Sequence, residues 1–136
     1  MNIRLIPGLR AVALGAALSL LGQMIPAAPA LAQDAVKADA KHYKVEFEND
    51  QVRVLRIQYG PHEKSSMHAH PNSVAVFLTD ASAKFTLPDG KTNTMDAKAG
   101  TTMWTAAGKH LPENTGDKPF ELILVELKHK KAAAAK

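Results

Sequence analysis

Cysteine is absent from this chain of 136 residues. Disulfides, thiolate metal ligands and thiol nucleophiles are therefore excluded. Aromatic residues make up only 5% of the chain, with a single tryptophan. No segment after residue 41 sustains the 3.6-residue apolar period of a helix. These absences favour a small domain that is held together by an apolar core of strands.

The chain also lacks a strong excess of charge of one sign. Its 17 Lys and Arg residues against 13 Asp and Glu residues give a net charge of +4. Part of that excess lies in Arg4 and Arg10 near the start and in the lysines of the last seven residues. The part between them is near neutral, so we expect no nucleic-acid partner.

Residues 1–32 have the three-part pattern of a secretory signal peptide. Arg4 and Arg10 precede an uncharged, mainly apolar run over 11–25, and Ala30-Leu31-Ala32 supplies the small residues of a cleavage site. A membrane anchor is the alternative, but the run is shorter than the roughly 20 apolar residues of a span. We therefore expect cleavage after Ala32, a periplasmic or secreted protein, and no stable membrane anchor afterwards. The lack of an Arg-Arg pair favours general secretion, and the lack of cysteine excludes a lipoprotein.

The remainder of the chain is typical of an all-β domain. Residues 33–41 contain no large side chain and are expected to form a flexible arm, and the Lys- and Ala-rich residues 129–136 a disordered tail. Pro88-Asp89-Gly90-Lys91 is the strongest hairpin signal. A continuous apolar run over 74–78 predicts a fully buried strand. We expect one antiparallel barrel or sandwich over 42–128, with strands at 43–47, 52–58, 74–78, 84–87, 92–95, 101–105 and 120–127.

Three histidines form the candidate site. His68 and His70 are separated by one residue, so on extended chain they point to the same face while Ala69 points away. His110 follows a later strand and is expected to approach them from across the barrel. Three neutral imidazoles suit a divalent metal ion, with iron(II), manganese, nickel and zinc as candidates, and they leave coordination positions open.

These residues resemble the first motif of a small single-domain cupin of the RmlC-like jelly-roll type. That motif has a glycine, then H-x-H, then a glutamate three or four residues on, and then a second glycine. Gly60, His68 and His70 match it. Val74 or Ala75 stands where the glutamate is usual, and the second glycine is missing.

The second cupin motif is similar to a later part of the chain, with Gly100, Gly108, His110 and Asn114 in the corresponding places. Ala106 replaces the usual proline. The resemblance covers about 43–127 and implies a single-domain cupin-type antiparallel β-barrel with His68, His70 and His110 as metal ligands. Without the glutamate such a site has no negative charge of its own, so a bound metal would stay more Lewis acidic. Glu63 lies in the loop before the histidines and is a weak substitute.

Three functions fit this sequence. The first is a metal-dependent enzyme that acts on a small molecule, with a dioxygenase-like reaction leading and an isomerase or lyase as the other options. The second is a non-catalytic module that binds a small ligand or a metal for sensing. The third is a metal-free, degenerate barrel. The resemblance also implies a possible homodimer through an edge strand.

Several other residues are weaker candidates for a role in the site. Asn114 either supports a histidine or holds a turn. His62 is expected to be exposed, and His42 and His129 to be incidental. Tyr59 and Gln58 end a strand near the site and are further candidates for ligand contact. Five residues either line a pocket at the mouth of the barrel or are simply core, namely Phe77, Phe85, Met103, Trp104 and Phe120.

Overall fold

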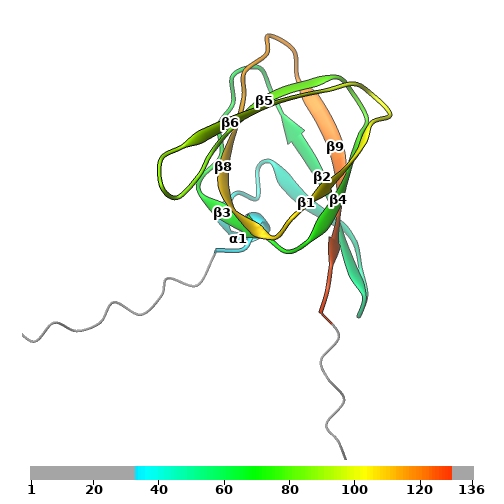
Figure 1. Ribbon diagram of the computed structural model, residues 1–136. Coiled ribbons are helices and arrows are strands. Elements are labelled where there is room, and N and C mark those ends of the chain that lie inside the picture. Colours follow the sequence, from blue (N-terminus) through cyan, green and yellow to red (C-terminus); the bar gives the residue numbers. More distant parts are fainter. Residues whose placement is uncertain (1–32, 130–136) are drawn as a thin grey trace, which may run out of the picture.

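A computed structural model describes residues 33–129 of the chain (Figure 1). The predicted signal peptide, 1–32, and the tail from residue 130 onward lie outside the described residues. The described part contains one short helix and nine strands. They are α1 (Ala35–Ala38), β1 (Tyr43–Glu48), β2 (Val52–Tyr59), β3 (His68–His70), β4 (Ser73–Phe77), β5 (Ala81–Thr86), β6 (Thr92–Ala97), β7 (Thr102–Thr105), β8 (Gly108–Asn114) and β9 (Phe120–Leu127).

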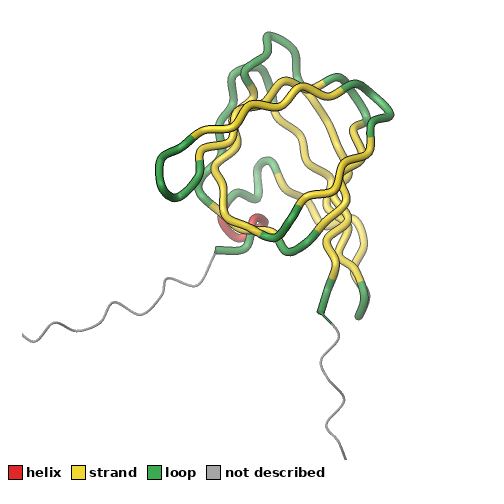
Figure 2. The backbone as a smooth tube through the Cα atoms, in the orientation of Figure 1, coloured by secondary structure: helices red, strands yellow, loops and turns green. Residues whose placement is uncertain are grey.

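The strands form two antiparallel sheets that curve around a common interior (Figures 1 and 2). The five-stranded sheet has the order β1-β2-β9-β4-β7, and the four-stranded sheet has the order β3-β8-β5-β6. The all-β prediction is confirmed. Neither sheet closes on itself, so the barrel consists of two facing sheets. No helix in the described part of the chain has the length and apolar character that a membrane span requires.

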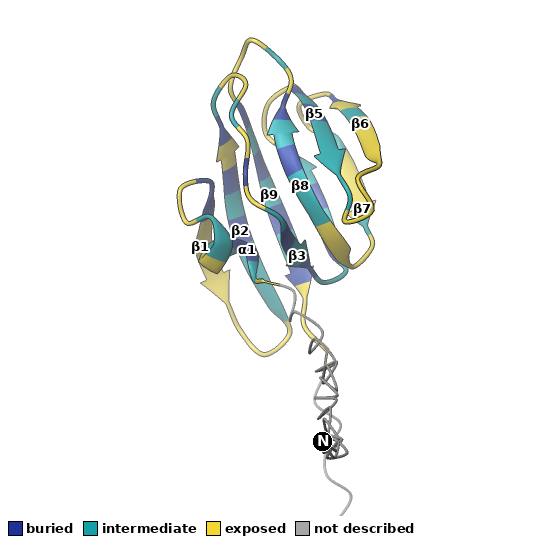
Figure 3. Cartoon of the chain, turned by 90° about the vertical axis from the view of Figure 1, so that its left-hand side faces the viewer, coloured by how far each residue is buried: buried dark blue, intermediate teal, exposed yellow. Residues whose placement is uncertain are grey.

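Strand alternation places the core between the two sheets. In β9, Phe120, Leu122, Leu124 and Glu126 are buried while the residues between them are only partly covered. Leu55, Ile57 and Tyr59 of β2 face the same interior, and the dark stripes on these strands mark it in Figure 3. Fully burying one such apolar side chain stabilises the fold by about 1.5–3 kcal/mol.

The turns agree with the sequence. The strands β5 and β6 pair in register from Ala81–Ala97 to Thr86–Thr92, and they are joined by the predicted Pro88–Lys91 turn. Gly90 and Gly100 have φ angles of 83° and 82°. Glycine adopts this left-handed conformation without the steric cost of a Cβ atom. The hairpin prediction is therefore confirmed.

Three strands differ from the prediction. The apolar run over 74–78 is not fully buried, because β4 buries only Ser73, Ala75 and Phe77 and turns its other side chains outward. Strands β3 and β8 were not predicted as strands. The polar segment that contains β3 was expected to be a loop, and Gly108 and Pro112 in β8 read as loop residues. Pro112 has no amide hydrogen to donate, but it lies beyond the β3 pairing that ends at His110, and its carbonyl still accepts from the Ser65 amide at 3.0 Å.

The segment expected to be a flexible arm, 33–41, is instead folded against the domain. The Asp34 carboxylate caps α1 by accepting from the Val36 and Lys37 amides. Ala35 is completely buried, and the Ala69 amide donates to the Gln33 carbonyl at 2.9 Å. A four-residue helix is too short to show a hydrophobic period, and its contacts are with distant residues, so the sequence pattern did not reveal it.

Candidate metal centre

The three predicted histidines lie together on two neighbouring strands. His68 and His70 come from β3 and His110 from β8, and the register pairs His68 directly with His110. Strand alternation turns all three rings to the interior. One ligand nitrogen from each lies within 4.8 Å of the others. His110 therefore reaches the pair from the adjacent strand, and the expected approach from across the barrel is wrong.

Hydrogen bonds fix the outer nitrogens of two of these rings. His68 Nδ1 lies 2.8 Å from the Ser66 carbonyl oxygen, and His70 Nδ1 lies 2.6 Å from Glu126 Oε1. A carbonyl and a carboxylate only accept, so each Nδ1 carries the proton. In the neutral imidazole, Nε2 is then the atom with the free lone pair.

These two lone pairs face each other. His68 Nε2 and His70 Nε2 are 3.1 Å apart in the interior. Two acceptors at that distance repel unless a cation or a shared proton lies between them. A nitrogen of His110 lies close to both. The three neutral imidazole nitrogens can therefore coordinate one divalent metal ion between them.

Burial keeps the rings in the ligating form. Desolvation lowers the pKa of His68 to about 4. Desolvation, with the charges of His70 and His68 as the next causes, lowers the pKa of His110 to about 3. Both rings are therefore neutral near pH 7, and their lone pairs are available without the loss of a proton.

A chain of ion pairs that runs from the buried Glu126 to the partly exposed Arg53 and Asp34 supports His70 from behind, and sequence reasoning missed it. Glu126 Oε2 accepts from Arg53 Nε at 2.5 Å, and Arg53 also donates to Asp34 Oδ2 at 2.5 Å. Burial opposes ionisation of Glu126, yet the hydrogen bonds from His70 and Arg53 hold its pKa below the ordinary value. Glu126 therefore remains a carboxylate and orients the His70 ring.

The sequence did contain a signal for Glu126. In Phe120–Leu127 the apolar residues Phe120, Leu122 and Leu124 share one parity, and Glu126 continues it. A carboxylate on the buried face of a core strand requires a partner. That partner is Arg53, which stands directly opposite in the β2–β9 register, and only the pairing of the strands identifies it.

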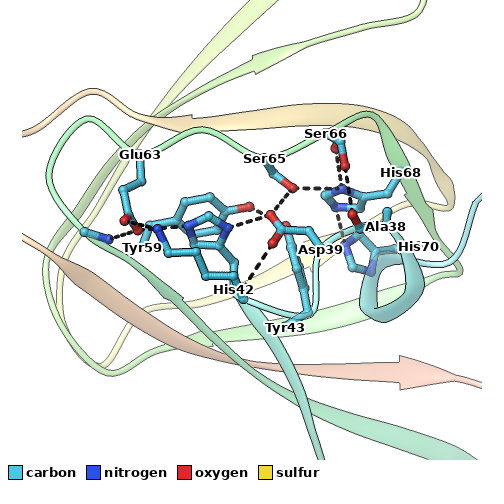
Figure 4. A network of polar contacts seen from close by, with 12 residues as sticks. Ala38, Asp39, His42, Tyr43, Tyr59, Glu63, Ser65, Ser66, His68 and His70 are labelled. Atoms are coloured by element: carbon cyan, nitrogen blue, oxygen red, sulfur yellow. Dashed lines mark hydrogen bonds and ion pairs between the residues drawn. The ribbon is translucent and has the colours of Figure 1, made fainter.

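His42 was expected to be incidental, and this is wrong. It is buried between two carboxylates, with Nδ1 2.5 Å from Asp39 Oδ2 and Nε2 2.9 Å from Glu63 Oε2. Its ring stacks on Tyr59 at 4.2 Å between centroids. Figure 4 shows this array beside the site, where Ser65 donates to Asp39 at 2.7 Å and lies 3.5 Å from His68 Nδ1.

Glu63 does not join the three histidines. Its carboxylate accepts from Lys41, from His42 and from the Gly60 amide. The hydrogen bond from Lys41 is the largest cause that lowers the Glu63 pKa to about 2. Glu63 is thus part of the His42 array.

Asn114 holds a turn. Its Nδ2 donates to the carbonyls of Gly60 and Lys118, and its Oδ1 accepts from the Gly116 amide. The turn interpretation is therefore the one that the contacts support. His62 is exposed, as expected, and His129 is exposed as well.

A cavity of about 460 Å³ lies next to His70 and His110. Ala75 faces it from β4, so the inward position where a glutamate is usual carries no carboxylate. Tyr59 lines it, whereas the exposed Gln58 does not. The five residues considered as pocket lining or core all line it, namely Phe77, Phe85, Met103, Trp104 and Phe120. A larger hollow of about 780 Å³ lies elsewhere, beside Asp80 and Asp117, and contains none of the three histidines.

Comparison with solved structures identifies the fold. A cupin domain from Bordetella pertussis Tohama I superposes with a TM-score of 0.59 and 24% identity, covering 64% of this chain and 92% of that chain. The fold is the cupin fold. An RmlC-like cupin with a double-stranded β-helix from Methanocaldococcus jannaschii gives a TM-score of 0.51 and 21% identity over 73% of this chain and 92% of its own.

An oxalate decarboxylase also shares the cupin fold with this chain. It is 19% identical, with a TM-score of 0.50, and the match covers 71% of this chain but only 28% of that one. No protein-family model matches the sequence, and a search of curated proteins gave no significant match. At these identities the likeness concerns the fold alone, so function must be argued from the site.

Proposed function

We propose that this cupin-fold protein is an exported metalloprotein in which His68, His70 and His110 hold one divalent metal ion beside a small-molecule cavity. The observation that carries the proposal is the 3.1 Å separation of His68 Nε2 and His70 Nε2. Their outer nitrogens are already committed to Ser66 and Glu126. The export rests on the signal-peptide pattern of 1–32.

The leading activity is a dioxygenase-like oxidation with iron(II). A metal ion held by neutral donors supplies Lewis acidity and open coordination positions, and iron adds redox chemistry. The chain itself contributes the three fixed imidazoles, the carboxylate of Glu126 behind His70, and apolar walls that exclude water. Isomerase and lyase reactions are the other options.

A non-catalytic binding role is the second candidate, and one observation favours it. Within residues 33–129, no Asp or Glu lines the cavity. A general base must lie within hydrogen-bond reach of the proton that it removes. A reaction that requires a protein carboxylate in the cavity is therefore disfavoured, and simple ligand binding needs none.

The proposal includes a homodimer through an edge strand. Strand β1 is at the edge of the five-stranded sheet, and Val45 and Phe47 on it are exposed by 45% and 53%. Exposed edges and apolar side chains favour pairing with a second copy. Light scattering on the eluting protein should give twice the chain mass, and Phe47→Lys should return it to the monomer.

Metal content tests the main proposal. The chain, expressed with its own leader and without a histidine tag, is purified from the exported fraction and analysed by elemental mass spectrometry. We expect close to one iron, manganese, nickel or zinc ion per chain. The His68→Ala/His70→Ala variant should lose it, whereas His62→Ala, which removes an exposed histidine paired with Asp117, should keep it. Absence of metal after anaerobic reconstitution would contradict the proposal.

A further inference from the structure

We infer that the cavity beside the histidines takes a small molecule with an uncharged, apolar body, which can place at most one polar group at the histidine end. This inference deepens the proposed function and rests on it for the role of the site. The inference concerns the class of ligand. The evidence for that class comes from the residues that line the cavity.

The walls are apolar on both sheets. Leu122, Leu124 and Ile57 face the cavity from the five-stranded sheet, and Phe85 and Met95 face it from the four-stranded sheet. Contact with such walls stabilises a bound ligand in proportion to the apolar area that leaves water, by about 25 cal/mol per Å². The volume of about 460 Å³ is in the range of small-molecule sites.

Charged side chains are missing from the walls. Among the described residues, no Lys, Arg, Asp or Glu lines the cavity, and the polar side chains there, apart from the histidines and tyrosines, are Asn93, Thr94 and Thr105. Moving an ionised carboxylate from water into such surroundings is costly unless a cation meets it. A ligand that carries charge away from the histidines therefore binds poorly.

The nearby cations are already engaged. Arg53 donates to Glu126 and Asp34. Arg56, on the opposite parity of β2, is bonded to Glu46 and Glu121. Neither guanidinium is available to a carboxylate inside the cavity without breaking these pairs, so the structure offers an anionic ligand only the histidine end.

The two tyrosines in the cavity supply no charge either. The Tyr43 and Tyr59 hydroxyls are hydrogen-bonded to each other at 2.7 Å. Burial raises the pKa of both phenols above the ordinary value. They stay neutral, and their mutual bond satisfies part of their polarity, so the rings present apolar surface to the ligand.

The rim of the cavity is apolar and includes a tryptophan, whose fluorescence can be followed. Met103 and Trp104 of β7 line it and are exposed by 36% and 58%. Trp104 is the only tryptophan in the chain. Met103 pairs with the inward-facing Ala75, whereas Trp104 pairs with Val74, which turns outward. The heat of binding therefore measures occupancy directly, and indole fluorescence reports a change at this edge strand.

The test uses three probes of one rigid shape: adamantan-1-ol, adamantane-1-carboxylate and adamantane-1,3-dicarboxylate. Each is titrated into the purified exported protein, both metal-free and metal-loaded, with Trp104 fluorescence and calorimetry as readouts. In metal-free protein we expect the alcohol to bind more than about tenfold tighter than the monocarboxylate, because an uncompensated buried charge costs at least this much. The dicarboxylate should bind neither form.

Met103→Lys is the diagnostic variant because the residue is exposed and the change places a cation at the rim. It should raise affinity for the monocarboxylate about two- to fivefold, as expected for an exposed ion pair, and lower affinity for the alcohol. Leu78→Lys is the matched control, since Leu78 is similarly exposed but does not line the cavity. It should change neither affinity.

The outcomes separate this inference from the proposed function. Binding of the alcohol by a protein that takes up no metal supports the inference and contradicts the metal proposal. The inference is overturned if metal-free protein prefers either carboxylate, or if none of the probes changes Trp104 fluorescence or gives heat. A dicarboxylate that binds the metal-loaded form as tightly as the alcohol overturns it as well.

Discussion

His68 and His70 each have one nitrogen fixed to an acceptor and the other turned toward its neighbour. The acceptors differ, because His68 Nδ1 meets the Ser66 carbonyl and His70 Nδ1 meets the carboxylate of Glu126. The carboxylate, unlike the carbonyl, places a full negative charge behind the ring that it orients. At the residue scale, the site therefore depends on Glu126 as well as on the three histidines.

Replacing Glu126 by Gln should weaken metal binding about 10- to 100-fold, in the range usual for the partner behind a ligating histidine. The amide oxygen still accepts from His70 Nδ1, but the negative charge is lost. Competition with a chelator at pH 7 measures the change in the metal Kd.

Glu121→Gln is the matched control for this change. Glu121 is in the same strand on the opposite parity and is bonded to Arg56, so its loss should leave the metal Kd unaltered. An unchanged Kd in Glu126→Gln, in a variant that still unfolds cooperatively, would show that Glu126 does not support a ligand.

The stability of the metal-free protein should depend on pH through the buried histidines. The folded-state pKa values of His68 and His110 are about 4 and about 3, below the value near 6.5 in an unfolded chain. The unfolded state binds protons first, so the free energy of unfolding should fall as pH drops below about 6.5, by about 1.4 kcal/mol per pH unit for each histidine. Above that pH these two histidines do not change the free energy of unfolding.

Urea denaturation between pH 7.5 and pH 5 measures this slope. The carboxylates are ionised in both states over most of that range, so they add little to it. The His68→Gln/His110→Gln variant should have a flatter profile. A wild-type profile as flat as that of the variant would contradict the buried, neutral state of the two rings.

At the scale of elements, the shortest strand holds two of the three ligands. Strand β3 has only three residues and pairs with β8 on one side. On its other side the Ala69 amide donates to the Gln33 carbonyl, and α1 packs beside it (Figure 1). The N-terminal segment thus completes the support of β3.

Asp34→Ala should loosen this segment. The change removes the cap of α1 and the ion pair with Arg53, and loss of a cap alone costs about 1 kcal/mol. We expect a lower Tm and faster hydrogen exchange at the Ala69 amide. Asp50→Ala, at an exposed position in the β1–β2 turn, should leave both unchanged. Equal exchange rates in the two variants would show that α1 does not protect β3.

At the scale of the whole molecule, the proposed signal-peptide cleavage site lies directly before Gln33, a residue that takes part in the fold. The predicted cleavage after Ala32 leaves Gln33 as the first residue, and Gln33 already bonds to Ala69. Cleavage there would keep the whole of the supporting segment.

The intact mass of the exported protein should therefore correspond to a chain that begins at Gln33. Small residues are required at the cleavage site, so Ala30→Arg/Ala32→Arg should retain the full-length mass in the membrane fraction. A soluble protein of full-length mass in the cytoplasm of the producing cell would contradict the signal peptide.

Features that depend on local spacing and turn chemistry could be predicted from the amino-acid sequence. The apolar stretch Phe120–Leu127 predicted a long strand, Pro88 to Lys91 predicted a hairpin, and the spacing of His68 and His70 put both rings on one face. These follow from the geometry of a single stretch of chain. The cupin fold and the three histidines could accordingly be predicted before any coordinates.

The way in which those stretches meet depends on the three-dimensional packing of the chain. The direct pairing of His68 with His110 depends on the register of β3 and β8. The chain from His70 through Glu126 and Arg53 to Asp34 joins residues that are far apart in sequence, and the burial of His42 depends on Asp39 and Glu63 closing around it. Partners of this kind are set by strand register and packing, which no local pattern records.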